Sequence, residues 1–353
     1  PGHAPRSIRL EIVDYPGERL VDMPMLRLSF AQWSAQTLQE ASHGPRAALS
    51  QAWRKALENL DTLTDVEDEP CRNAIAAYHA YLQACRGQGL EYLQPSAVLL
   101  EADAAGLDIE FCPLPANLIE DCPAVAKAFG DRYRDYVEGY VQPFARAAAA
   151  CSRQIVLVDV LRVLRQGVHT FNDTRRCLQN VLDVFGYARP VQWYNPLDWG
   201  RWLFSNGREI ERVAFIATKA DQASRHSRPR LKDLLRELVR CKEQDIRLDL
   251  NAERLATYFV AAVRCTTDAE TEFHGQVLGL LQGRRADKPA DATGPWFPGE
   301  APGEWPSEDW NPGERQYRFP DFLPRRLPPR DGATFDHINL DKALWHVLED
   351  LVT

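Results

Sequence analysis

The stretch "RVAFIATKAD", Arg212–Asp221, decides the fold class of this chain. Its first six residues form a short run of mostly apolar side chains, and the polar group Thr218-Lys219-Ala220-Asp221 follows at once. A continuous apolar run of this length is typical of a strand buried on both faces, as in a parallel sheet. Because open α/β sheets bind ligands beyond the carboxyl ends of their strands, we expect these polar residues to line a binding site.

Two similar runs lie on either side of this strand. "RQIVLVDVL" (Arg153–Leu161) precedes it, and "TYFVAAVRCTTD" (Thr257–Asp268) follows it. The intervals show helical periodicity at about residues 170–185 and 229–244, with Asn172 or Asp173 as the N-cap of the first helix. Strands that alternate with helices predict a doubly wound α/β sheet.

The three polar residues of this group suit the recognition of guanine. A carboxylate at Asp221 accepts two hydrogen bonds, which guanine offers from its ring N–H and its exocyclic amine and adenine does not. The stem of Lys219 can lie flat on a base, and the Thr218 hydroxyl can brace the loop. Cys265 and Thr266 follow the last strand, where a backbone amide usually contacts the guanine carbonyl. The alternative interpretation is an ordinary turn, with Lys219 and Asp221 as a capping pair at a helix entry.

A related motif stands near the start of the chain in "LEIVDYPGERL", Leu10–Leu20. The alternating and then apolar pattern of residues 8–13 predicts a strand that stops at Asp14. Asp14 can hold a magnesium-bound water, and the Gly17 amide can bond a γ-phosphate oxygen because no side chain blocks it. Glu18 stands where many GTPases keep a water-positioning Gln, so it is the candidate catalytic residue. The alternative here is again a turn with a solvent-facing Glu.

The spacing of the two motifs predicts a large insertion. Residues 25–150 carry long helical periodicities, such as "CRNAIAAYHAYLQACRGQGLEYL". We therefore expect residues 1–24 to start a GTPase core, residues 25–150 to form a mostly helical inserted domain, and residues 151–282 to complete the core. Residues 283–353 read as a Pro- and Trp-rich surface segment followed by a C-terminal helix. "GQVLGLLQGRR" (Gly275–Arg285) reads as a helix.

Composition excludes some functions and favours others. The net charge of −8 and the sequence pI of about 5.6 argue against nucleic-acid binding. No apolar run approaches the roughly 20 residues that a membrane span needs. The eight cysteines are scattered and form no Cys-x-x-Cys pair, which favours a reducing compartment and hence the cytoplasm.

Several segments together resemble the YcjX-like family of bacterial stress-associated GTPases. They are "LEIVDYPGERLVDMPML", "RQIVLVDVLRVL", "TFNDTRRCL", "RVAFIATKAD", "WFPGEAPG" and "HINLDKALWHVLEDLV", and they span essentially the whole chain. The resemblance implies a GTP-binding P-loop domain with a large helical domain, a cytoplasmic location, a link to envelope stress and a possible protein partner at the cytoplasmic membrane face. It implies that Asp14 and Gly17 face Mg²⁺ and the γ-phosphate, and that Lys219, Asp221 and Thr266 surround guanine.

One part of the family pattern is missing from this sequence. No Gly-x-x-x-x-Gly-Lys-[Ser/Thr] motif occurs in the 353 residues. Since backbone amides and the lysine of that motif bind the phosphates, we expect an N-terminally truncated P-loop GTPase-like fold. The predicted function is a slow GTPase switch that binds GTP or GDP with Mg²⁺. The alternative is a nucleotide-independent interaction scaffold that uses the helical domain and the Trp/Pro-rich tail.

Overall fold

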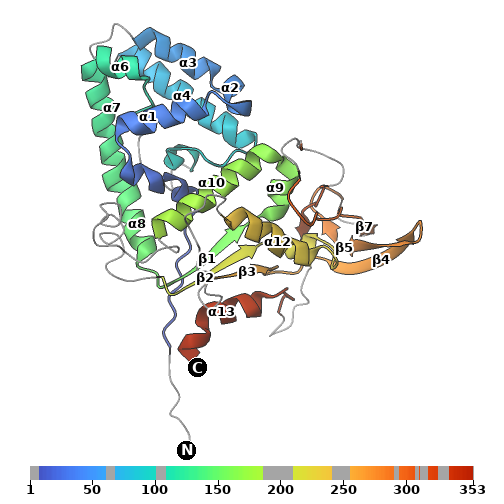
Figure 1. Ribbon diagram of the computed structural model, residues 1–353. Coiled ribbons are helices and arrows are strands. Elements are labelled where there is room, and N and C mark those ends of the chain that lie inside the picture. Colours follow the sequence, from blue (N-terminus) through green and yellow to red (C-terminus); the bar gives the residue numbers. More distant parts are fainter. Residues whose placement is uncertain are drawn as a thin grey trace, which may run out of the picture.

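A three-stranded parallel sheet lies at the centre of one half of the molecule (Figure 1). The computed structural model describes residues 8–60, 68–100, 109–185, 210–240, 255–289, 294–306, 310, 317–324 and 334–352. The strands are β1 (Arg153–Val158), β2 (Arg212–Ala217) and β3 (Leu255–Phe259), in the order β1-β2-β3. In register, Ile155 lies opposite Ala214, and Phe215 lies opposite Thr257. The predicted parallel α/β sheet is therefore present.

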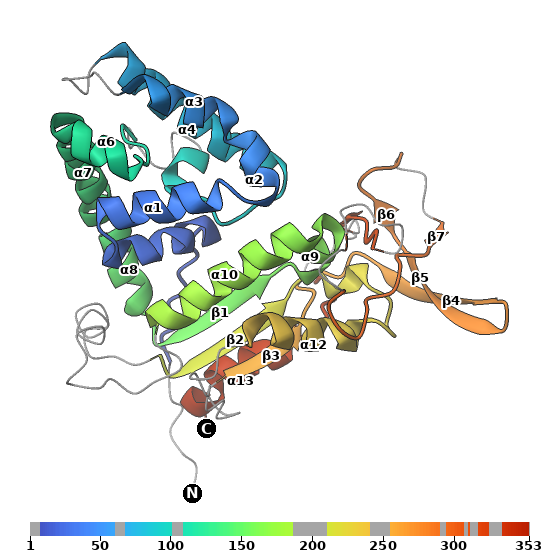
Figure 2. The same ribbon diagram turned by 45° about the horizontal axis from the view of Figure 1, so that its top comes forward.

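Helices cover both faces of this sheet (Figures 1 and 2). On one face α9 (Val160–Gln166), α10 (Val168–Phe185) and α12 (Arg228–Val239) share a core with Val213, Phe215 and Ala217. On the other face α13 (Leu340–Val352) packs against Ala214 and Ile216 through Ala343 and Val347. Because side chains alternate along a strand, β2 serves both cores at once. The C-terminal helix therefore docks on the sheet.

The helix α10 begins earlier than the sequence suggests. It starts at Val168, directly after Gly167 (φ 89°), which ends α9. Asn172 and Asp173 consequently lie inside the helix, so neither is its N-cap. The predicted extent of the next helix is also corrected: α12 ends at Val239, and residues 241–250 lie outside the described part.

The helical region has a hydrophobic core of its own. Its largest fully buried side chains include Trp33, Trp53, Phe111 and Phe129. Its elements in chain order are η1 (Gly17–Arg27), α1 (Phe30–Glu40), α2 (Gly44–Leu49), α3 (Gln51–Leu57), η2 (Glu58–Leu60), α4 (Glu69–Gly87), η3 (Ser96–Leu99), α6 (Ala116–Asp121), α7 (Pro123–Tyr136), η4 (Val137–Val141) and α8 (Gln142–Ala149). The described parts of residues 25–150 are thus mostly helical.

A β-hairpin replaces the helix expected at Gly275–Arg285. β4 (Thr267–Phe273) and β5 (Gln276–Gln282) pair antiparallel, and the hairpin projects from the molecule in both views (Figures 1 and 2). β7 (Pro295–Trp296) joins β5, while β6 (Arg284–Arg285) pairs with β8 (Phe322–Leu323). The helix was predicted wrongly because a short apolar run fits the period of a strand as well as that of a helix. In the hairpin Gly279 allows a close approach, since a Cβ at this position would lie 2.7 Å from the Cβ of Ser224.

The predicted strand at residues 8–13 is not formed. The segment makes no ladder in the described structure, and Leu10, Ile12 and Val13 are 56%, 81% and 53% exposed. A strand needs a neighbour that supplies backbone hydrogen bonds, and apolar alternation alone cannot provide one. In β1, Ile155 and Leu157 are not buried as predicted: α13 covers their neighbours Ala214 and Ile216 in β2 but leaves these two side chains 41% and 67% exposed.

The Pro- and Trp-rich segment contributes to the core instead of only covering it. Trp305 and Trp310 stack on each other and contact Phe171, with Trp310 donating to the Leu164 carbonyl at 3.2 Å. Phe319 is completely buried in the same core. The Trp-rich residues around 193–202 lie outside the described part. None of the helices in the described ranges is long and apolar enough to cross a membrane.

Candidate nucleotide site at the carboxyl ends of the strands

The loop after β2 is fixed by backbone hydrogen bonds to both neighbouring strands. The Thr218 amide donates to the Val158 carbonyl at 3.0 Å, and the Ala220 amide donates to the Val260 carbonyl at 3.1 Å. Between them Lys219 adopts a left-handed backbone (φ 56°, ψ 33°), and a short turn, η5 (Ala220–Gln222), follows. A non-glycine residue in this conformation is strained, and such strain often marks a functional site.

Asp221 joins this loop to the loop after β3. Its side-chain oxygen Oδ2 accepts a hydrogen bond from the Cys265 amide at 2.8 Å, and its carbonyl accepts one from the Thr266 hydroxyl at 2.6 Å. Asp221 is 4% exposed. Burial raises the pKa of its carboxyl, and the hydrogen bond from the Cys265 amide opposes that rise. The structure thus brings together five predicted site residues: Thr218, Lys219, Asp221, Cys265 and Thr266.

An acidic residue that sequence reasoning missed clamps these two loops. Asp268 accepts from Arg228 at 2.8 and 2.9 Å and from Arg264 at 2.8 Å. The Nε of Arg228 donates to the Ala220 carbonyl, and the Nε of Arg264 donates to the Thr266 carbonyl. Each guanidinium therefore holds one loop while Asp268 holds both guanidinium groups. Arg228 is the first residue of α12, where the helix dipole disfavours a positive charge. An arginine at this position in the sequence could therefore have indicated an acidic partner.

The ammonium group of Lys219 lies between two carboxylates. Nζ is 2.9 Å from Asp159 Oδ2 and 3.5 Å from Asp321 Oδ1. Partial burial lowers the pKa of Lys219, but the hydrogen bonds and charges of the two acids outweigh it, so the pKa is raised. Asp159 follows β1, and Asp321 comes from the segment before β8. Neither acid was recognised in the sequence.

The N-terminal motif lies elsewhere. Tyr15 packs edge-on against Phe144 of α8, with ring centroids 5.3 Å apart. Burial and, to a smaller extent, the negative charge of Glu11 raise the pKa of Cys151, which precedes β1. Figures 1 and 2 both place this segment beside the start of β1, whereas Lys219 and Asp221 follow the end of β2. Asp14, Gly17 and Glu18 are exposed, and Glu18 lies 3.5 Å from Arg86. The structure does not bring these three residues to the other five.

Asp14 by itself does not form a magnesium site in the described structure. Magnesium prefers several oxygen ligands in near-octahedral geometry, and Asp14 is an exposed residue outside any helix or strand. Within the residues that the structure describes, no group of three or more His, Cys, Asp or Glu side chains could hold a metal.

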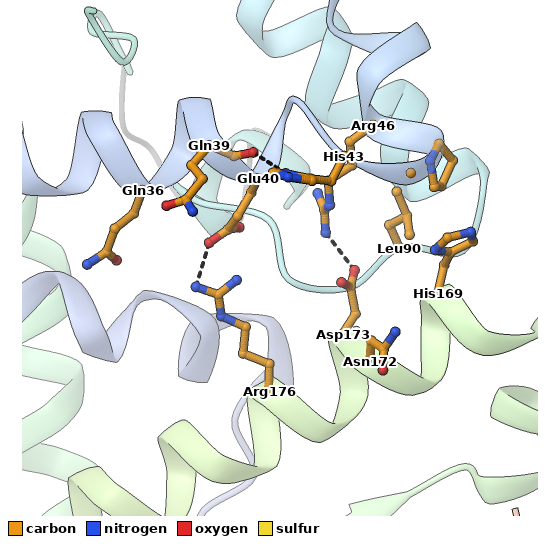
Figure 3. A pocket seen from close by; sticks show the side chains of 12 residues that line it. Gln36, Gln39, Glu40, His43, Arg46, Leu90, His169, Asn172, Asp173 and Arg176 are labelled. Carbon is orange, nitrogen blue, oxygen red and sulfur yellow. Dashed lines mark hydrogen bonds and ion pairs between the residues drawn. The ribbon is translucent and has the colours of Figure 1, made fainter. Parts of the chain in front are cut away.

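Two cavities lie near the sheet. One, of about 560 Å³, is lined by Arg165, Arg285, Arg318, Trp296, Asp287 and Asp321, so Asp321 connects it to Lys219. The other, of about 420 Å³, separates α1 and α2 from α10 (Figure 3). Its charged walls neutralise each other, because Glu40 pairs with Arg176 and Arg46 pairs with Asp173.

The sequence of this chain is similar to those of known proteins. The profile of the YcjX-like family, DUF463, matches residues 2–352. The chain belongs to the YcjX-like family. Among curated relatives, it is 31% identical over 356 residues to the Ras-like GTPase YcjX of Escherichia coli K12, covering 98% of this chain and 72% of that protein. It is 27% identical over 358 residues to the Ras-like GTPase YcjX of Shewanella oneidensis, covering 98% of this chain and 70% of that protein.

Family membership agrees with the resemblance stated from the sequence motifs. It also agrees with the fold at a coarse level, because the described chain combines a parallel sheet with many helices. A YcjX-like chain with the Thr218–Asp221 loop at the carboxyl edge of that sheet is the basis for the functional proposal.

Proposed function

We propose that this protein binds guanine nucleotides at the carboxyl ends of β2 and β3. The observation that carries the proposal is the buried Asp221, placed beside Lys219 and tied to Cys265 and Thr266. A carboxylate so placed can accept two hydrogen bonds from the guanine edge, and it is already surrounded by a loop that supplies backbone amides. The clamp around Asp268 supports the arrangement, because it fixes both loops before a ligand arrives.

The wider proposal is a slow GTPase switch. It rests on the order of the motifs along the chain and on the printed name of the two curated relatives, Ras-like GTPase YcjX. Asp14 and Gly17 stay predicted contacts of magnesium and γ-phosphate, Glu18 stays the candidate catalytic residue, and the segment that changes with the nucleotide would extend to Met25. For these contacts the segment would have to lie at the carboxyl edge of the sheet.

The alternative, an interaction scaffold without nucleotide, loses part of its motivation. Two tryptophans of the tail, Trp305 and Trp310, fill the core beside Phe171 and are not presented to a partner, whereas Trp345 of α13 is 54% exposed. The cytoplasmic location, the stress role and a protein partner at the membrane face stay predictions from the scattered thiols and the resemblance.

Base recognition is tested by calorimetric titration of the natural protein with GDP, XDP and ADP. We expect GDP to bind and ADP not to bind. Asp221→Asn should weaken GDP by at least ~10-fold and bring XDP into the GDP range, since an amide can donate to the extra carbonyl of xanthine. Asp233→Asn, an equal charge change on the exposed side of α12, should leave GDP affinity unchanged. Unaltered GDP preference in Asp221→Asn would remove Asp221 from base recognition.

A further inference from the structure

Lys219 is a long side chain whose position the structure determines at both ends. Its backbone is held in the left-handed region, and its ammonium group lies 2.9 Å from Asp159 Oδ2. A lysine stem has several freely rotating bonds, so a free Lys219 would have to lose this freedom whenever a base packed on it. Fixing the ammonium beforehand removes that cost from binding.

Asp159 is itself rigid, which is what a positioning group requires. It follows the last residue of β1 and is the N-cap of α9, where its Oδ1 accepts from the Arg162 amide at 2.9 Å. Its second oxygen is the one that meets Lys219. Thus Oδ1 of Asp159 caps α9, and Oδ2 pairs with Lys219.

Asp321 is the weaker of the two partners of Lys219. Its Oδ1 is 3.5 Å from the ammonium group, and the same oxygen accepts from Gln222 Nε2 at 3.1 Å. Its side chain is 52% exposed, against 20% for Asp159. A solvated and shared carboxylate restrains a cation less than a partly buried one.

We infer that Asp159 is a positioning residue of the nucleotide site, and that it acts by holding Lys219 so that the stem lies ready under the base. The inference rests on the proposed guanine site and deepens it. The alternative is that Asp159 only caps α9 and that its ion pair with Lys219 does not affect nucleotide binding.

Asparagine separates these two roles. As an N-cap, Asn is about as good as Asp, so Asp159→Asn keeps the bond from the Arg162 amide while removing the charge that attracts Lys219. Lys219→Met keeps an unbranched apolar stem and removes the ammonium. The two substitutions therefore delete the same ion pair from opposite sides, which makes a double-mutant cycle informative.

The test is GDP titration of the natural protein, the two single variants, their double variant and Asp321→Asn, at fixed salt and magnesium. We expect Asp159→Asn to weaken GDP binding about fivefold with an unchanged melting temperature. In the Lys219→Met background Asp159→Asn should have no further effect, and Asp321→Asn should change affinity less than about twofold.

The outcomes are distinguishable. Wild-type affinity in Asp159→Asn, an effect that adds fully to that of Lys219→Met, or a larger effect of Asp321→Asn would each overturn the positioning role alone. Absence of GDP binding to the unaltered protein would overturn the guanine site, and the inference with it.

Discussion

Asp22 is a carboxyl group sealed inside the helical region. It is 1% exposed and accepts hydrogen bonds from the amide and hydroxyl of Ser96 and from the Tyr136 hydroxyl. Burial outweighs these hydrogen bonds and raises the pKa of Asp22 to about 6. In the unfolded chain the group titrates near 3.8. Between these values the folded protein binds more protons than the unfolded chain does.

The sign of the pH effect follows from this difference. The contribution of Asp22 to the free energy of unfolding is fully present below pH 3.8 and is lost as the pH rises through about 6. About 1 kcal/mol of that loss falls between pH 5 and 7.5. Urea unfolding at pH 5 and 7.5 should show that the free energy of unfolding falls more with rising pH in the natural protein than in Asp22→Asn. Asp131→Asn, a surface control, should keep the natural slope, and an Asp22→Asn protein with the same slope would contradict the prediction.

The position of one sequence motif in the fold could be predicted from its own residues, and that of the other could not. Thr218–Asp221 follows a strand whose two neighbours are both present, so the loop lies where the pattern predicted. Asp14 follows a segment with no ladder partner in the described chain, so its place could not be predicted from its own residues.

At the scale of elements, the helical region meets the sheet region through charged side chains on α10. Asp173 Oδ2 accepts from Arg46 at 2.6 Å and from the amides of Glu91 and Tyr92 at 2.9 and 3.2 Å (Figure 3). The side chains of Arg46 and Asp173 are only 10% and 14% exposed. Glu91 also pairs with Arg162 of α9 at 2.8 Å. The contact is thus built from partly buried ion pairs as well as apolar packing.

Removal of Asp173 should therefore be costly. Asp173→Ala would leave Arg46 without its carboxylate and two amides without an acceptor, so we expect a loss of roughly 3–5 kcal/mol in the free energy of unfolding. The Glu40–Arg176 pair joins α1 to the same helix α10 but is more exposed, at 22% and 42%, so Arg176→Gln should lower the free energy of unfolding by only about 1 kcal/mol. Equal losses in urea unfolding of the two variants would show that burial does not set the cost.

At the scale of the whole molecule, the helical region and the sheet region have separate hydrophobic cores. One lies among the helices of residues 25–141, and the others lie on the two faces of the sheet. The elements that join them meet partly through the ion pairs of α10. Cores that share few apolar contacts can unfold as separate cooperative units.

We therefore expect two transitions in scanning calorimetry. Phe129→Ala should lower the transition temperature of the helical region only, and Phe215→Ala that of the sheet region only. Each substitution removes a fully buried ring from one core, so each should reduce the free energy of unfolding of its own region by roughly 3–5 kcal/mol. GDP should raise only the sheet transition. A single transition that both substitutions shift together would show that the cores unfold as one unit.

Sequence alone determined the local elements and their chemistry. The apolar runs at β1 and β2, the helical periodicity of residues 25–150 and the Thr218–Asp221 loop all depend on near neighbours, so their patterns could be read directly. Tertiary structure decided which segments meet. It made Gly275–Arg285 part of a hairpin, left residues 8–13 unpaired, and turned Asp173 from a supposed cap into an interface residue. It also assembled Asp159, Asp268 and Asp321 around the loop. These outcomes depend on partners distant in sequence, whose hydrogen bonds and charges no local pattern contains.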